Sequence, residues 1–161
     1  MAVDMFLKID DIKGESIDAT YKDAIKVLSW SWGMSQSGST HHGLGSGSGK
    51  VAVQDISITK PIDKSTPNLI KMCCNGTHFK EATLIVRKAG GKKPVDYLTI
   101  KMTRGLVSSI STGGSGGEDE ITEQVTLNFG AFKLEYKPQA GEGAGEAAIP
   151  AAFYIAKNAE S

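Results

Sequence analysis

Apolar and polar residues alternate along most of this chain, which is the pattern of half-buried β-strands. Glycine, proline and asparagine lie between most of the alternating stretches, as is typical of turns. The stretches with this alternation are residues 3–9, 25–34, 51–59, 83–88, 95–102, 106–112, 121–136 and 153–157. The pattern predicts a mainly β fold, an antiparallel β-barrel made of two curled sheets.

The strand expected at residues 25–34 has two very different faces. Leu28, Trp30 and Trp32 fall on one face, and Ser29 and Ser31 fall on the other. The tryptophan face carries enough apolar area to be buried in a core. The serine face is small, polar and uncharged, so we interpret it as a wet surface that a partner touches or as an ordinary solvent-facing side of a sheet.

Two of the strand patterns change phase partway. Within residues 51–59 the apolar phase switches at Gln54 and Asp55, which is the sequence mark of a β-bulge. Within residues 121–136 it switches at Gly130, and glycine is the residue that a bulge or sharp bend uses. A strand that changes face partway serves two sheets, as the corners of a barrel require.

One stretch has the spacing of a helix. Residues 65–75 begin with Ser65 or Thr66 as a cap, have Pro67 in the first turn, and end at Gly76. Apolar residues inside it recur at three- and four-residue spacing. We therefore expect one α-helix flanking the β-barrel.

The chain is expected to form a single domain spanning residues 1–161. Residues 37–50 form a glycine- and serine-rich loop that is too long for an ordinary hairpin turn. Residues 138–150 have low complexity and are expected to link the barrel to the last strand. The two cysteines, Cys73 and Cys74, are neighbours in the helix and are expected to be buried free thiols.

The charge balance limits the kinds of partner. Lysine and arginine number 18 and aspartate and glutamate number 18, so the net charge gives no electrostatic case for binding nucleic acid. Identical neutral copies repel one another little, which suits self-association. No apolar stretch is long enough to span a membrane, and the N-terminus lacks the pattern of a signal peptide. We expect a soluble cytoplasmic chain that leaves the cell, if it does, without a cleavable leader.

No arrangement of residues predicts catalysis, a metal site or a cofactor. His41 and His42 lie in the glycine-rich loop without nearby carboxylates or thiols, which makes them a poor metal site. The sequence GSGSGK at residues 45–50 lacks the first glycine of a phosphate-binding loop, and Val51 stands where a hydroxyl is needed. No serine has an evident histidine partner.

Several long runs are similar to one known family. They read VLSWSWGMSQSGS over residues 27–39, VQDISITKPIDKSTPNL over 53–69 and VSSISTGGSGGEDEITEQVTLNF over 107–129, and the N-terminal MAVDMFLKI fits as well. Over nearly its whole length the chain thus resembles the haemolysin-coregulated (Hcp) proteins of bacterial type VI secretion.

This resemblance implies a barrel and helix like those of phage tail-tube proteins, and a ring of six copies that stacks into a tube. It also implies sheath and spike proteins as partners, and secretion from the bacterial cytoplasm. Small effector proteins are expected to be carried and protected in the pore. Ser29 and Ser31 are then expected to line the pore and contact the effectors.

The loop at residues 37–50 is similar to the extended loop of this family, which reaches toward the adjacent subunit or ring. The residues expected to make this contact are Ser39, His41, His42, Leu44 and Lys50.

Two rival functions belong to other classes. One is a monomeric β-sandwich that binds a small ligand near Trp30 and Trp32. The other is a hydrolase whose catalytic residues are scattered along the sequence. The oligomeric mass separates the ring from the binding module, and turnover that a serine variant abolishes is required for the hydrolase.

Overall fold

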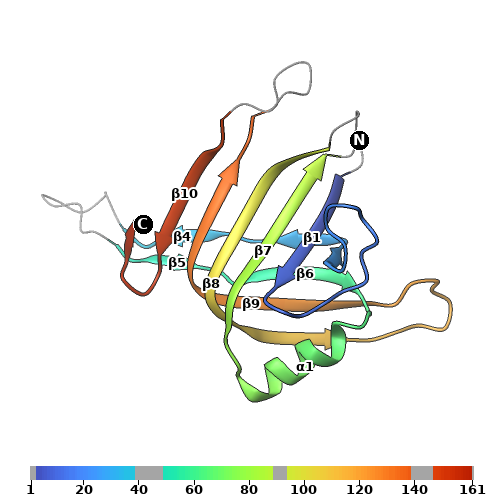
Figure 1. Ribbon diagram of the computed structural model, residues 1–161. Coiled ribbons are helices and arrows are strands. Elements are labelled where there is room, and N and C mark those ends of the chain that lie inside the picture. The colour runs from blue at the N-terminus through green and yellow to red at the C-terminus, as the bar shows by residue number, and fades with distance from the viewer. Residues whose placement is uncertain (1–2, 39–48, 89–93, 139–146, 161) are drawn as a thin grey trace, which may run out of the picture.

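The computed structural model describes residues 3–38, 49–88, 94–138 and 147–160 (Figure 1). In these ranges it contains eleven strands and one helix. They are β1 (Val3–Ile9), β2 (Ile25–Val27), β3 (Ser29–Ser31), β4 (Met34–Gln36), β5 (Val51–Val53), β6 (Ile56–Pro61), α1 (Thr66–Asn75), β7 (Phe79–Lys88), β8 (Val95–Thr112), β9 (Thr122–Tyr136), β10 (Ile149–Tyr154) and β11 (Ala159–Glu160).

The long hairpin of β8 and β9 belongs to both layers of the molecule. The first half of β8 pairs with β7, which is followed by β1 and β2, while the end of β9 pairs with β10, which pairs in turn with β11. The first half of β9 pairs instead with β6, which pairs with β3. Figure 1 shows the hairpin bending from one layer into the other, with α1 beneath the lower arm of β8. Every paired register is antiparallel, and a mainly β antiparallel fold with one helix is confirmed.

The change of phase predicted at Gly130 is confirmed. On β9 the buried residues are odd-numbered up to Phe129 and continue with Phe132 on the other phase. Across the hairpin, Arg104 has a left-handed φ of 51°, and Gly105 pairs with Phe129. Of the two glycines at this bend of the hairpin, Gly105 is the one that must be glycine, because a Cβ there lies 2.9 Å from Phe79 Cε2 and nearer still to the Asn128 carbonyl oxygen.

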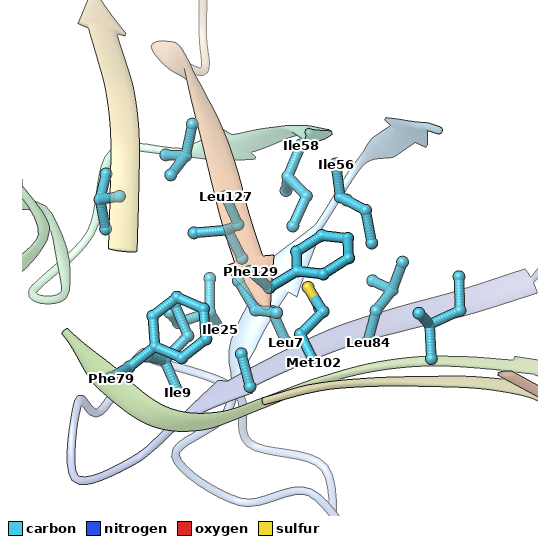
Figure 2. Close-up of a cluster of buried hydrophobic side chains, with 14 of the residues drawn as sticks. Leu7, Ile9, Ile25, Ile56, Ile58, Phe79, Leu84, Met102, Leu127 and Phe129 are labelled. Atoms are coloured by element: carbon cyan, nitrogen blue, oxygen red, sulfur yellow. The ribbon is translucent and has the colours of Figure 1, made fainter. Parts of the chain in front are cut away.

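The hydrophobic core fills the space between the two layers (Figure 2). Leu7 on β1 and Leu84 on β7 contribute from one layer, and Ile58 on β6 and Leu127 on β9 contribute from the other. All four side chains are completely buried. Since both layers use alternate positions to reach the core, each also has an outward face of the opposite parity.

Two of the predicted strands are divided in the structure. Residues 25–34 form β2, β3 and the first residue of β4, and residues 51–59 form β5 and most of β6. The predicted bulge at Gln54 and Asp55 is a complete break, after which the chain changes sheet: β5 pairs with β4, whereas β6 pairs with β3 and β9. A change of sheet reverses the buried phase just as a bulge does, so the sequence pattern is the same for both.

The closed barrel is not confirmed. Among the described residues no paired register joins β2 to β6, although Leu28 alone separates β2 from β3.

The predicted helix is present as α1. It ends at Asn75, and the next residue, Gly76, has a left-handed backbone conformation with φ 64°. Cys73 is half-buried and Cys74 is exposed, so the prediction of two buried thiols is wrong. Leu69 of α1 is completely buried in the core, and Met72 and Cys73 are partly buried against it.

The last long strand starts earlier than expected. β10 begins at Ile149, within the stretch predicted as a linker, and ends at Tyr154. Its apolar residues are mixed with alanine and proline, so the alternation that identifies a strand is weak there.

Candidate functional site

One face of the β3–β6–β9–β8 section carries small, uncharged polar side chains. Two rows cross these four strands in register: Ser29 opposite Thr59, then Gln124 and Ser111; and Ser31 opposite Ser57, then Thr126 and Ser109. Residues directly opposite one another in a sheet point to the same side. We call the following eight residues the hydroxyl face: Ser29, Ser31, Ser57, Thr59, Ser109, Ser111, Gln124 and Thr126.

The core determines which way this face points. Ile56 and Ile58 on β6 and Val125 and Leu127 on β9 alternate with members of the hydroxyl face and are completely buried. The hydroxyl face is therefore forced outward, and its eight residues are exposed or partly exposed. This confirms that the serine side of the strand is outward, and Trp30 on the other side packs against the core.

A hydrogen-bonded cluster closes one end of the hydroxyl face. Ser108 is an extra residue on β8, because Val107 pairs with Leu127 and Ser109 pairs with Thr126. Its Oγ donates to Asp55 Oδ2 at 2.6 Å and lies 2.7 Å from Thr126 Oγ1. Asn128 Nδ2 donates to the other carboxylate oxygen of Asp55 at 2.8 Å.

Only Ser29 and Ser31 of this face are predicted from the sequence. The other six members also alternate with apolar residues, as in Ser57-Ile58-Thr59, but that pattern is common to most exposed strand faces. What makes them one surface is the register between strands that are far apart in the sequence. A single sequence does not specify that register.

Most of the predicted ring-contact loop lies outside the described residues. Ser39, His41, His42 and Leu44 belong to that part. Lys50 is described and is exposed immediately before β5. The two ends of the loop are joined by the pairing of β4 with β5 and by the Ser37 Oγ–H, which donates to the Lys50 carbonyl oxygen at 3.3 Å.

An apolar groove lies between the β4–β5 pair and the β9–β10 edge. Its volume is about 860 Å³. The Trp32 ring meets the Phe132 ring edge-on at 4.8 Å between centroids, and Trp32 Nε1 donates to the Gln54 carbonyl oxygen at 2.8 Å. The apolar residues that line the groove are Trp32, Met34, Val51, Val53, Phe132, Leu134, Pro150, Ala151, Ala152 and Phe153, and Lys133 and Glu160 complete it.

The segment between β1 and β2 is fastened to the outward face of β7 by Arg87. The guanidinium forms an ion pair with Asp18, lies 3.3 Å from Asp4 Oδ2, and stacks over the rings of Phe6 and Tyr21. The Tyr21 hydroxyl donates to the Asp96 carboxylate on β8. Burial, together with this bond, raises the pKa of Tyr21 above its usual range.

Acid is expected to weaken this attachment. The hydrogen bond from Arg87, followed by that from the Tyr21 N–H, holds the pKa of Asp18 well below its usual range. Because the folded-state pKa is lowered, ionised Asp18 stabilises the protein above about pH 4, and this contribution is lost as the pH falls further. Asp18→Asn should therefore show a shallower fall of melting temperature below pH 4 than the wild type. Asp11→Asn, at an exposed site, is the matched control. If the melting temperatures of all three proteins fell equally steeply below pH 4, ionised Asp18 would not stabilise the fold.

A buried ionic cluster attaches the start of α1 to the sheet. Lys60 on β6 is completely buried and forms an ion pair with Glu123 on β9. Glu123 is only 2% exposed. The Lys60 Nζ also lies 3.1 Å from Asp63 Oδ1 and donates to the Pro61 carbonyl oxygen at 2.9 Å. Thr66 Oγ1 donates to Glu123 Oε1 at 2.6 Å, which connects the first residue of α1 to β9.

The described residues contain no group of three or more His, Cys, Asp or Glu side chains placed to bind a metal ion. In the same part of the chain, no helix has the length and apolar character needed to cross a bilayer. His78 is exposed after α1, and the other two histidines lie outside the described residues. The chemistry available on the hydroxyl face is weak, reversible hydrogen bonding.

Comparison with known proteins agrees with this fold. Residues 6–136 match the family described as "Type VI secretion system effector, Hcp". The chain is 61% identical over 144 residues to "Protein hcp1" of Pseudomonas aeruginosa, which covers 89% of each chain. It superimposes with a TM-score of 0.82 on Hcp1 from Salmonella typhimurium, at 41% identity and full coverage of both chains. A structure described as a type six secretion system protein gives a TM-score of 0.92 at 28% identity, over 99% of this chain and 100% of the other. With a family match across most of its length and a relative this similar, the chain belongs to the Hcp family of type VI secretion proteins.

Proposed function

We propose that this chain, as one Hcp-like domain spanning residues 1–161, forms rings of six copies that stack into the inner tube of a type VI secretion system. The hydroxyl face lines the pore of each ring and binds small effector proteins during export. The observation that carries this proposal is the continuous uncharged surface of eight residues across four strands. Small neutral side chains bind varied proteins weakly enough to release them.

The edges of the same sheet section support a ring. β3 at one end, and the 106–112 part of β8 at the other, have no further strand beside them among the described residues. Unpaired strand edges favour association with another chain. Two different edges on one molecule suit a head-to-tail contact that closes into a ring.

Closure of each subunit into a barrel like that of phage tail-tube proteins is part of the proposal. It is supported by the continuity of β2 with β3 and by the Leu28 N–H, which donates to the Thr59 carbonyl oxygen at 2.8 Å. The loop at residues 37–50, with Ser39, His41, His42, Leu44 and Lys50, then contacts the adjacent subunit or ring.

The proposed partners are further copies of this chain, the secreted effectors, and the sheath and spike proteins of the secretion machine. We propose that the protein is made in the bacterial cytoplasm and leaves it through the machine. The tube carries and protects its cargo and does no chemistry of its own. Nucleic acid is not among the proposed partners, since the chain has no net charge.

The oligomeric mass tests the ring. Size-exclusion chromatography with light scattering should give a species near six times 17.0 kDa. A single 17.0 kDa species at every concentration would overturn the proposal.

Ser31→Gln tests whether the hydroxyl face holds the cargo. Six longer side chains would narrow the pore, so we expect intact rings that retain about tenfold less co-expressed effector, which corresponds to a loss of roughly 1.4 kcal/mol. The matched control is Thr103→Gln, because Thr103 is exposed on the other half of β8. Equal effector retention by the two variants would remove Ser31 from the cargo site.

A monomeric ligand-binding module remains a second candidate because of the apolar groove beside Trp32. Grooves of this size and composition commonly bind small apolar molecules. A 17.0 kDa monomer that binds a small apolar fluorophore, with the binding lost in Trp32→Ala, would favour this function over the ring.

A further inference from the structure

Exposed large apolar side chains gather at two places on the molecule. Of the nine in the described residues, four belong to one surface and three to the groove, which leaves Ile70 and Tyr154 outside both. Val3, Ile17 and Ile62 line one hollow, and the Ile62 N–H donates to the Ile121 carbonyl oxygen at 3.0 Å. We call these four residues, Val3, Ile17, Ile62 and Ile121, the Ile17 surface.

The groove has the other three members. Met34 lines it directly. On β9 and β10, Leu134 and Ala151 are opposite each other and line the groove. Tyr136 and Ile149 are also opposite each other, two residues further along each strand, so they extend the same face. Its lining includes the aromatic residues Trp32, Phe132 and Phe153, and its volume of about 860 Å³ easily admits a branched aliphatic side chain.

Ile17 protrudes from a rigid segment. It is 97% exposed, although the residues beside it are tightly bonded. The next residue, Asp18, accepts hydrogen bonds from the N–H groups of Thr20 and Tyr21 at 2.9 and 3.0 Å and pairs with Arg87. A backbone segment that is already held in place loses little conformational entropy when its exposed side chain binds, which favours affinity.

The two surfaces lie at opposite ends of the molecule. In Figure 1, β4, β5 and β10 are at the left, and the segment that joins β1 to β2 is at the right. Two different surfaces far apart on one chain allow a head-to-tail contact, which can repeat from copy to copy. Patches of this kind on a soluble chain usually mark interaction sites.

Charge does not oppose such a contact. Lys133 and Glu160 balance each other in the groove lining. The hollow beside Ile17 is lined by Asp4, Glu15, Asp18 and Asp63 and by Lys26; Arg87 pairs with Asp4 and Asp18, and Lys60 pairs with Asp63. Only the Ile17 surface therefore has an excess of negative charge, and a neutral groove does not repel it.

We propose that the Ile17 surface of one copy packs into the apolar groove of a neighbouring copy, with Ile17 as the central anchor. This contact rests on the proposed function, because it requires the copies to assemble. It assigns the assembly contact to these two surfaces in addition to the strand edges of the hydroxyl face.

Ile17→Asp tests the anchor. Light scattering at micromolar concentration should show the variant as a 17.0 kDa species with an unchanged circular dichroism spectrum, while the wild type stays assembled. Ile70→Asp, at an exposed position outside both surfaces, should assemble like the wild type. An Ile17→Asp variant that assembles like the wild type would overturn the contact and leave the ring intact; a wild type that is itself monomeric would overturn the proposed function too.

Disulfide trapping identifies where the anchor docks. In a background of Cys73→Ser and Cys74→Ser, the pair Ile17→Cys and Ala151→Cys should give, on mild oxidation of the assembled protein, a ladder of linked copies on a non-reducing gel. A ladder that ends at six copies places the contact within a ring, and one that continues further places it between stacked rings. The pair Ile70→Cys and Ala151→Cys should give no ladder. Assembled protein that gives no ladder with the first pair, or only dimers, would refute the contact.

Discussion

Replacing Lys60 by methionine is expected to lower the free energy of unfolding by about 3–5 kcal/mol, because removing one partner of a buried ion pair leaves the other charge buried and unpaired. Glu123 would lose its cation, and Asp63 would lose a partner at 3.1 Å. The start of α1 depends on the same cluster through the bond from Thr66 to Glu123. Urea unfolding at one fixed protein concentration measures the change, since assembly makes stability depend on concentration.

The double variant Lys60→Met with Glu123→Leu is the control. When both charges are removed and apolar side chains fill the space, the loss should be smaller than for Lys60→Met alone. A loss below about 1 kcal/mol for Lys60→Met would show that water reaches the cluster and would contradict its buried role.

Gly105→Ala is expected to destabilise the protein by about 3 kcal/mol or more, since overlap with backbone forces strands apart. The added Cβ would overlap the Asn128 carbonyl oxygen and the edge of the buried Phe79 ring. Neither group can move easily: Asn128 belongs to the paired strand β9, and Phe79 is 1% exposed. The melting temperature of the variant, compared with the wild type at equal concentration, reports the effect.

Gly130→Ala is the matched control on the same hairpin. The nearest atom to a Cβ at Gly130 is the Arg104 carbonyl oxygen at 3.6 Å, which is an ordinary contact. We expect this variant to stay within about 1 kcal/mol of the wild type. If Gly130→Ala were the more damaging of the two, the bend of the hairpin would depend on β9 and not on β8.

Sequence patterns locate faces well because a face depends only on local alternation. The outward Ser29 and Ser31 and the phase change at Gly130 were predictable for that reason. The pattern also placed the glycine of a bulge or bend at Gly130. It missed Gly105, because the groups that exclude a side chain there belong to β7 and β9, which are distant in sequence.

Features that join distant segments were not predictable from one sequence. The hydroxyl face needs the register of four strands, and the groove needs β4 and β5 to lie beside β10. The exposure of Cys74 depends on which side of α1 the sheet covers, and the helical spacing alone leaves this open.

A cryo-electron microscopy map of the purified protein tests the central claim most directly. We predict closed six-membered particles in which Ser29, Ser31 and Thr126 border the central channel. Particles whose channel is bordered by another surface, or single 17.0 kDa subunits without any channel, would contradict it.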